Sequence, residues 1–339
     1  MPDFTHQMNP SPTTAPRSNS DFADRVCVKC STPASLTCSG CKSTTTDANR
    51  RYCSAACQRD DWDEHKMDCK HAKVKNIQAR FFRAAIILEN IWEAYREKLF
   101  DKLITKIEKK DGSLVLHEND DRWFNSPYDM LEPFPFHLLP EPSDKLAVLN
   151  FMACGDTLAY LNDVVELLFR DLSTKIVEVA INDMIPKMTI TPVDVRGDIR
   201  SPTRRHALWK VTLKNCAGIY ALDLTGAQFG HMDAPTIPWD IYRASRIGRA
   251  GSPFQRRAFP AITHAVSGWL SDNNTTLWDT IQLPQPMFDK CVAGIVDAVT
   301  VGIEERLRIA RELDEQSISR TKLSLGNNCS ELVQEHAAL

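Results

Sequence analysis

Cysteines and one histidine recur in closely spaced pairs near the start of this 339-residue chain. Seven of its eleven cysteines lie between Cys27 and Cys69, and the other four are scattered along the rest of the sequence. Two pairs have the spacing C-x2-C, which lets one short turn present two thiols. The other two pairs place their donors four residues apart, on one face of a helix. The four pairs are Cys27/Cys30, Cys38/Cys41, Cys53/Cys57 and His65/Cys69.

Thiolates and imidazoles at these spacings are typical of structural zinc sites, in which four such ligands surround the ion as a tetrahedron. The eight donors are enough for two closed sites, so we predict two Zn²⁺ ions. A redox-active thiol cluster would not require the histidine, and a disulfide scaffold would spread its cysteines evenly through a small secreted chain. The spacing alone leaves open whether consecutive or alternating pairs share an ion.

The stretch "YCSAACQRDDWDEHKMDC" (Tyr52 to Cys69), with "CVKC" and "CSGC" upstream, resembles the MYND-type zinc finger. The resemblance implies a cross-braced fold in which alternating pairs share an ion. Eleven residues separate Cys41 from Cys53, more than is usual in the family, and we expect them to bulge out as a loop. The implied ligand sets are Cys27, Cys30, Cys53 and Cys57 for one ion, and Cys38, Cys41, His65 and Cys69 for the other.

The same resemblance implies a role in protein interaction, because such fingers dock short proline-containing peptides. A proline-rich segment is already extended and loses little entropy when it binds an aromatic groove. By position in the motif, Gln58 and Trp62 would line that groove, with Ser54 as a further candidate. The alternative is that Trp62 only covers the second zinc site. The function predicted is therefore a zinc-binding protein-interaction adaptor, or a transcriptional or chromatin regulator built on the same finger.

Charge and composition argue against two other classes of partner. A net charge of -3 does not favour general polyanion binding, and acidic residues crowd the helix of the finger, so we expect no nucleic-acid binding. The chain shows no signal-peptide core and no apolar run of roughly 18 residues, so we expect no membrane association. Clustered free thiols are typical of a reducing compartment. We therefore expect an intracellular protein, in the cytoplasm, the nucleus or both.

A second set of residues follows the order Cys154, His206, Asp223, in the stretches "ACGDTLAYL", "HALWKVTL" and "IYALDLTG". A cysteine at the start of a helix, a histidine opening a strand and an aspartate in the returning strand resemble the transglutaminase-like and related papain-like cysteine folds. The resemblance covers residues 145–250 or so, and "ACGDT" lacks the aromatic neighbours that the family's cysteine usually has. A methyltransferase domain of the SET type, which many MYND proteins carry, would need motifs that are absent here.

The second resemblance implies a thiol-dependent acyl-transfer enzyme, either transglutaminase-like or a peptidase. Cys154 would be the nucleophile, His206 the base, and Asp223 the group that orients the imidazole. Each residue also has a purely structural explanation. Cys154 would be a core residue, since free cysteine is among the most buried residue types, and His206 would be a solvated strand start. Asp223 would be a cap or bulge residue. Whether the chain is an enzyme therefore stays open.

Patterning along the chain predicts an α+β protein: a small two-zinc finger, a long bracing helix, and a mixed domain with a β-hairpin. Apolar residues at three- and four-residue steps between Lys73 and Lys110 predict the helix. Two strand patterns around Cys216 predict the hairpin. The predicted segments are a disordered tail (1–24), the finger (25–71), the helix (72–112), an acidic, proline-rich connector (113–142), the α+β domain (143–318) and a frayed tail (319–339).

Overall fold

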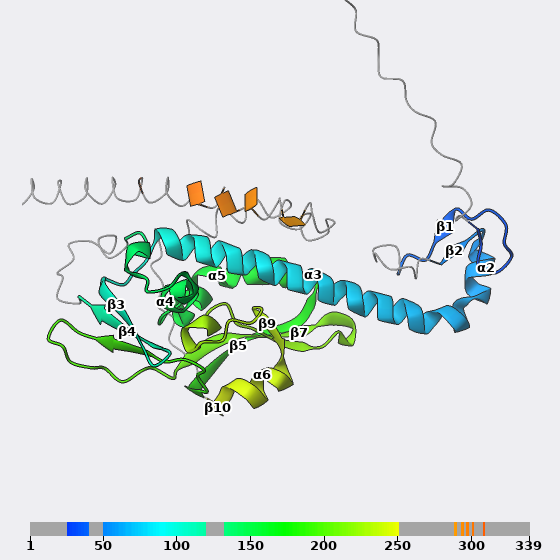
Figure 1. Ribbon diagram of the computed structural model, residues 1–339. Helices are drawn as coiled ribbons and strands as arrows, with labels where there is room; N and C mark the ends of the chain where they lie inside the picture. Colours follow the sequence, from blue (N-terminus) through cyan, green and yellow to red (C-terminus); the bar gives the residue numbers. More distant parts are fainter. Residues whose placement is uncertain are drawn as a thin grey trace, which may run out of the picture. The chain divides into compact units, whose positions relative to one another are not determined.

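The computed structural model divides the chain into two compact units, Met1–Asn76 and Ile77–Leu339, and each is described by itself. Both predicted tails, the inserted loop of the finger with its ligand Cys41, and most of the chain beyond residue 250 lie outside the described residues. Figure 1 shows the elements. The structure describes residues 26–40, 50–119 and 132–250, and the single positions 288, 289, 293, 294, 296, 297, 300, 301 and 308.

The first unit is a small finger with very little apolar core. Two short antiparallel strands, β1 (Leu36–Thr37) and β2 (Arg51–Tyr52), precede the helix α2 (Ala55–Asp60). The next helix, α3 (Trp62–Lys98), begins two residues after α2 ends. A core this small cannot offset the ordering entropy of the chain, so bound metal has to supply much of the folding free energy. The buried cluster consists of Cys27, Ala34, Cys38, Tyr52, Cys69 and Ala72.

The prediction of one helix over residues 72–112 is wrong at both ends. Helix α3 begins at Trp62 and ends at Lys98, and the sequence that follows forms a β-hairpin. Its strands β3 (Ile104–Lys110) and β4 (Ser113–Glu118) pair antiparallel, so the start of the predicted irregular connector is also a strand. Asp111 and Gly112 both have positive φ angles, 50° and 75°, which a two-residue hairpin turn requires.

The second unit is built on two sheets, which confirms the predicted α+β class. The larger is a five-stranded antiparallel sheet of order β10-β5-β7-β8-β9, and the smaller has the order β3-β4-β6. The predicted hairpin is present as β7 and β8. The strands not yet given are β5 (Ser173–Met184), β6 (Ile190–Val193), β7 (His206–Leu213), β8 (Ile219–Leu222), β9 (Thr236–Pro238) and β10 (Ile247–Ala250).

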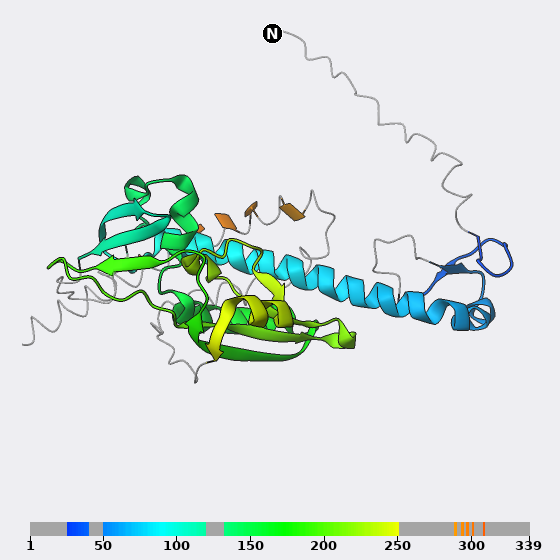
Figure 2. The ribbon, with the colours of Figure 1, turned by 60° about the horizontal axis from the view of Figure 1, so that its bottom comes forward.

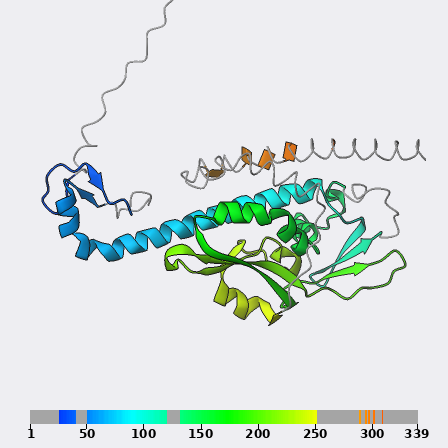
Figure 3. The ribbon, with the colours of Figure 1, turned by 180° about the vertical axis from the view of Figure 1, so that it is seen from behind.

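Helices cover both faces of the five-stranded sheet. Figures 1 and 3 show α5 (Cys154–Phe169) on one face, next to the C-terminal part of α3, and α6 (Trp239–Arg246) on the other. Figure 2 shows α6 from below. The short helix α4 (Lys145–Leu149) precedes α5, and the chain between them makes a turn in which Met152 has a positive φ of 54°. Because of this break, Cys154 is the first residue of α5. Short 3₁₀ turns occupy Phe136–Leu138, Pro142–Asp144, Lys214–Cys216 and Gly226–Phe229.

Candidate functional site

Four thiols of the finger converge in one group. The sulfur atoms of Cys27, Cys30, Cys53 and Cys57 all lie within 4.8 Å of one another. Cys30 Sγ lies 3.4 Å from Cys53 Sγ and 3.8 Å from Cys57 Sγ, and the latter two are 3.5 Å apart. A zinc–sulfur distance of about 2.3 Å corresponds to a sulfur–sulfur distance on the order of 3.8 Å across a tetrahedron. The donor set therefore fits zinc in chemistry and in size.

A second group consists of Cys38, His65 and Cys69, which are all buried and have ligand atoms within 4.8 Å of one another. Cys38 Sγ and Cys69 Sγ are 3.7 Å apart, again the separation expected across a zinc ion. The "CSGC" turn passes so close to this group that a Cβ added to Gly40 would lie 2.6 Å from Cys69 Sγ. A side chain at position 40 would therefore require Cys69 Sγ and the side chain of Lys73 to move.

The two groups combine alternating pairs of donors. The pair Cys27/Cys30 meets Cys53/Cys57, whereas Cys38 meets His65/Cys69. This is the arrangement that the first resemblance implied, and it differs from the consecutive pairing that spacing had left open. Each group therefore joins segments that are far apart in the sequence.

A buried carboxylate links two segments of the finger, and we did not predict it. Asp61 is 2% exposed and accepts hydrogen bonds of 3.0 and 2.9 Å from Arg50 Nη1 and of 2.8 Å from the Tyr52 hydroxyl. Lys29 lies 3.6 Å away. Burial would raise the pKa of Asp61, but these partners lower it below its usual value. The carboxylate thus ties β2 to the start of α3.

The three predicted peptide-binding residues occupy different environments. Trp62 opens α3 and is 46% exposed, with its ring edge-on to His65 at a centroid distance of 6.3 Å. Gln58 is half-buried on α2. Ser54 is the N-cap of α2, and its hydroxyl accepts a hydrogen bond of 3.3 Å from the Cys57 amide. The Ser54 side chain therefore already has a structural role, whereas the indole of Trp62 is available at the surface.

The second unit brings Cys154, His206 and Asp223 together from three elements. Cys154 opens α5, His206 opens β7 and Asp223 follows β8. The three residues are 3%, 0% and 7% exposed, which excludes the alternative that His206 is a solvated strand start. Adjacent antiparallel strands explain the meeting of the last two, because the start of β7 lies beside the end of β8.

One imidazole interacts with both other groups. His206 Nε2 lies 2.9 Å from Asp223 Oδ1. Burial would lower the pKa of His206, but the charge and hydrogen bond of Asp223, together with the nearby Cys154 thiol, raise it to about 10. The other ring nitrogen, Nδ1, has no hydrogen-bond partner among the described residues. The raised pKa favours the protonated ring, which Asp223 holds through Nε2.

Asp223 is held by groups that the sequence pattern did not identify. The Tyr242 hydroxyl donates to Asp223 Oδ2 at 2.7 Å, and the Thr225 amide donates to Oδ1 at 3.1 Å. Arg246 Nη1 lies 3.9 Å from Oδ2. Burial would raise the pKa of Asp223, but His206 and these donors lower it to about 2. Tyr242 and Arg246 lie on α6, and their only sequence signal was a short helical pattern.

Comparison with known proteins identifies the finger. Residues 27–69 match the family model of the MYND finger, and this match covers the cysteine pairs and the histidine described above. No curated protein and no solved structure matches the chain. Among the described residues, no helix combines the length and the apolar character needed to cross a bilayer. The first predicted resemblance is thereby confirmed: residues 27–69 form a zinc-binding finger of the MYND type.

Proposed function

We propose that this protein is an intracellular zinc-dependent interaction adaptor whose finger docks proline-containing peptides of other proteins against Trp62. The observation that carries the proposal is the position of Trp62. Its indole is 46% exposed at the surface, yet it packs edge-on against the buried ligand His65. An exposed aromatic ring fixed to a metal centre offers an extended peptide a rigid apolar surface at little entropic cost.

Two zinc ions would hold the helix starts that carry this surface. One ion would bind Cys53 and Cys57 at the beginning of α2, which presents Gln58. The other would bind His65, one turn after Trp62, with Cys41 as its fourth ligand. Gln58 would supply an amide for the backbone of the docked peptide, since an extended segment leaves its own amides and carbonyls unpaired. Zinc would thus act through structure and take no part in a reaction.

Fluorescence polarisation of a labelled Pro-His-Leu-Leu-Pro peptide tests the proposal. The zinc-loaded protein should bind the peptide, and Trp62→Ala should abolish binding while the zinc content stays unchanged. Met67→Ala is the matched control, because Met67 is a comparably exposed apolar residue on the same helix and is not part of the motif. Binding retained in Trp62→Ala, or lost equally in Met67→Ala, would contradict docking at Trp62.

Thiol-dependent acyl transfer is a second candidate, and a specific observation favours it. His206 is bonded to Asp223 at 2.9 Å and interacts with Cys154, which starts a helix. A neighbouring imidazolium and a helix start both favour the thiolate form of a cysteine. The thiolate would attack a carbonyl carbon to form a thioester, while the imidazolium transfers its proton to the leaving group. Asp223 would fix the orientation of the imidazole through Nε2.

Site-mapped alkylation tests the second candidate. Iodoacetamide should label Cys154, and His206→Gln should slow that labelling strongly. Cys216 is exposed and serves as an internal control whose labelling should not depend on His206. Equal rates at Cys154 in the wild type and in His206→Gln would remove the case for a thiol enzyme.

A further inference from the structure

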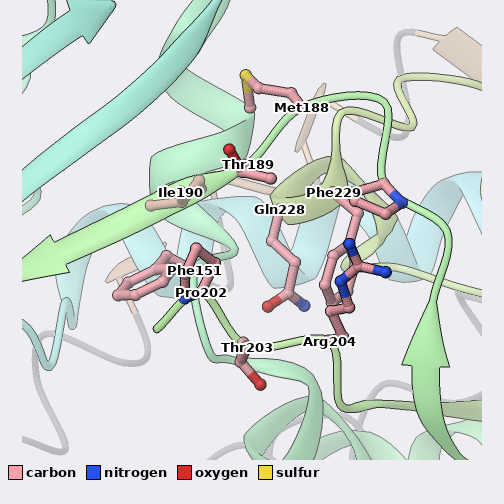
Figure 4. A pocket seen from close by; sticks show the side chains of 10 residues that line it. Phe151, Met188, Thr189, Ile190, Pro202, Thr203, Arg204, Gln228 and Phe229 are labelled. Carbon is pink, nitrogen blue, oxygen red and sulfur yellow. The ribbon is translucent and has the colours of Figure 1, made fainter. Parts of the chain in front are cut away.

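One buried glutamine connects the turn before Cys154 with the segment that follows Asp223. Gln228 is 3% exposed. Its Oε1 accepts a hydrogen bond of 3.1 Å from the Met152 amide, and its Nε2 donates one of 3.1 Å to the Thr225 carbonyl. Figure 4 shows the Gln228 side chain among the residues that line a small pocket. Its amide group therefore bridges two segments that are far apart in the sequence.

The turn before Cys154 needs an external contact of this kind. Met152 has a positive φ of 54°, which is disfavoured for a residue other than glycine and persists only where the surrounding structure enforces it. Ala153 is the N-cap of α5, and it makes no side-chain hydrogen bond to the first turn of the helix. Because α5 lacks a side-chain cap, the bond to Gln228 helps to fix where its first residue, Cys154, lies.

The other end of the bridge leads to the imidazole. The Thr225 amide donates a hydrogen bond of 3.1 Å to Asp223 Oδ1, the oxygen that lies 2.9 Å from His206 Nε2. The bridging glutamine belongs to the 3₁₀ turn Gly226–Phe229. The last residue of this turn packs its ring edge-on to the His206 ring, with the centroids 5.1 Å apart. One short turn therefore contacts both the segment that carries the thiol and the pair that would supply its base.

We propose that Gln228 is a positioning residue that keeps the Cys154 thiol aligned with the His206 imidazole. The inference rests on the second candidate function above, thiol-dependent acyl transfer. Gln228 acts through the Met152 amide and the Thr225 carbonyl, and it takes no part in bond formation or proton transfer. Without its amide group, the start of α5 and the imidazole would shift relative to each other. The imidazole would then stabilise the thiolate less.

Alkylation of Cys154 by iodoacetamide in two backgrounds tests this role. Gln228→Met keeps the length of the side chain and removes its amide, and it should slow labelling by about tenfold, the upper end of the effect of one hydrogen bond. In the His206→Gln background the same change should leave the rate unaltered, because no imidazole remains to be aligned. Gln228→Glu, a second variant, retains the acceptor for the Met152 amide and should label faster than Gln228→Met.

Gln78 provides the matched control, since it is another glutamine that bridges two segments of the second unit. Its Nε2 donates hydrogen bonds of 2.8 Å to the Ala217 carbonyl and of 3.1 Å to the Tyr220 hydroxyl, neither of which belongs to the cysteine site. Gln78→Met should leave the alkylation of Cys154 unchanged in both backgrounds. Urea unfolding of the two methionine variants measures the loss of stability that they share.

The outcomes separate positioning from packing. Cys154 is 3% exposed, so a change that only loosened the packing would expose the thiol and speed up its labelling. Where wild-type labelling depends on His206, a Gln228→Met rate equal to or above the wild type, or an equal slowing with and without His206, would overturn the inference and leave the thiol candidate standing. Wild-type labelling that does not depend on His206 would overturn both. A slowing that requires His206 and is absent in Gln78→Met would support positioning by Gln228.

Discussion

Tyr242 donates a hydrogen bond of 2.7 Å to Asp223, the carboxylate whose other oxygen lies 2.9 Å from the His206 ring. Both partners are buried, so this hydrogen bond contributes more to stability than it would at the surface. Tyr242→Phe should lower the free energy of unfolding by about 1.5–3 kcal/mol, the range for a hydrogen bond to a charged group. Urea unfolding measures this.

A second readout of Tyr242→Phe separates positioning from packing. The rate of Cys154 alkylation against pH should change, because an Asp223 held by fewer donors fixes His206 less firmly. Ser245→Ala removes a hydroxyl from the same helix, α6, at an exposed position and should leave both unfolding and the pH profile unchanged. Stability lowered with an unaltered pH profile would mean that Tyr242 serves packing alone.

The pair of His206 and Asp223 should make stability depend on pH. The pKa of His206 is raised to about 10, so its contribution is complete below the unfolded pKa of about 6.5 and is lost as pH rises toward 10. The pKa of Asp223 is lowered to about 2, so its contribution is present above the unfolded pKa of about 3.9 and is lost in acid. Both contributions are therefore complete between about pH 4 and 6.5.

Asp223→Asn measures this dependence. The variant should be less stable than the wild type by about 3–5 kcal/mol near pH 6, the range for breaking a buried pair. The difference in stability between the two proteins should shrink steadily from pH 7 to pH 10. Thermal or urea unfolding at each pH measures it. A difference that stays constant over that interval would show that His206 is not a cation in the folded protein.

Zinc content tests the two ligand groups separately. Cys27→Ser should remove one zinc ion per chain and Cys38→Ser the other, because the two residues belong to different groups. Inductively coupled plasma mass spectrometry of purified protein gives the stoichiometry. Cys216→Ser is the control and should retain both ions, since Cys216 lies in the turn between β7 and β8. Loss of all zinc in both finger variants would mean that neither site forms without the other.

Gly40→Ala should weaken the second site more than the first. An added Cβ would lie 2.6 Å from Cys69 Sγ, so the sulfur or the "CSGC" turn has to move. Competition with a chromophoric chelator should show one of the two ions released more readily, whereas Ser39→Ala, next to it and exposed, should behave as wild type. Wild-type zinc affinity in Gly40→Ala would contradict the close approach of this turn.

The finger was predictable because its determinants are local. Four donor pairs at fixed spacings already specify the ligands, and the metal imposes the geometry. Asp61 was not predicted as a central residue, because its partners Arg50 and Tyr52 meet it only after α2 folds back on β2. Acidic residues are common on a solvated helix face, and nothing in the local pattern sets Asp61 apart from them.

In the second unit, local patterns predicted strands but not long-range partners. The hairpin of β7 and β8 followed from two alternating patterns, and it places His206 beside Asp223. The helix predicted through Lys110 failed because apolar residues in β3 recur at a spacing that also fits a helix, as Ile104 and Ile107 show. Tyr242 could not be predicted, since α6 reaches Asp223 only through the packing of the whole sheet.

The measurement that tests the central claim most directly is the indole resonance of Trp62 in ¹H–¹⁵N spectra during titration with the Pro-His-Leu-Leu-Pro peptide. The resonance is assigned with Trp62→Phe. The account predicts a saturable shift of this signal in the zinc-loaded protein, and no shift after zinc is removed with a chelator. An indole signal that does not move in the zinc-loaded protein at saturating peptide, or one that moves equally without zinc, would contradict zinc-dependent docking at Trp62.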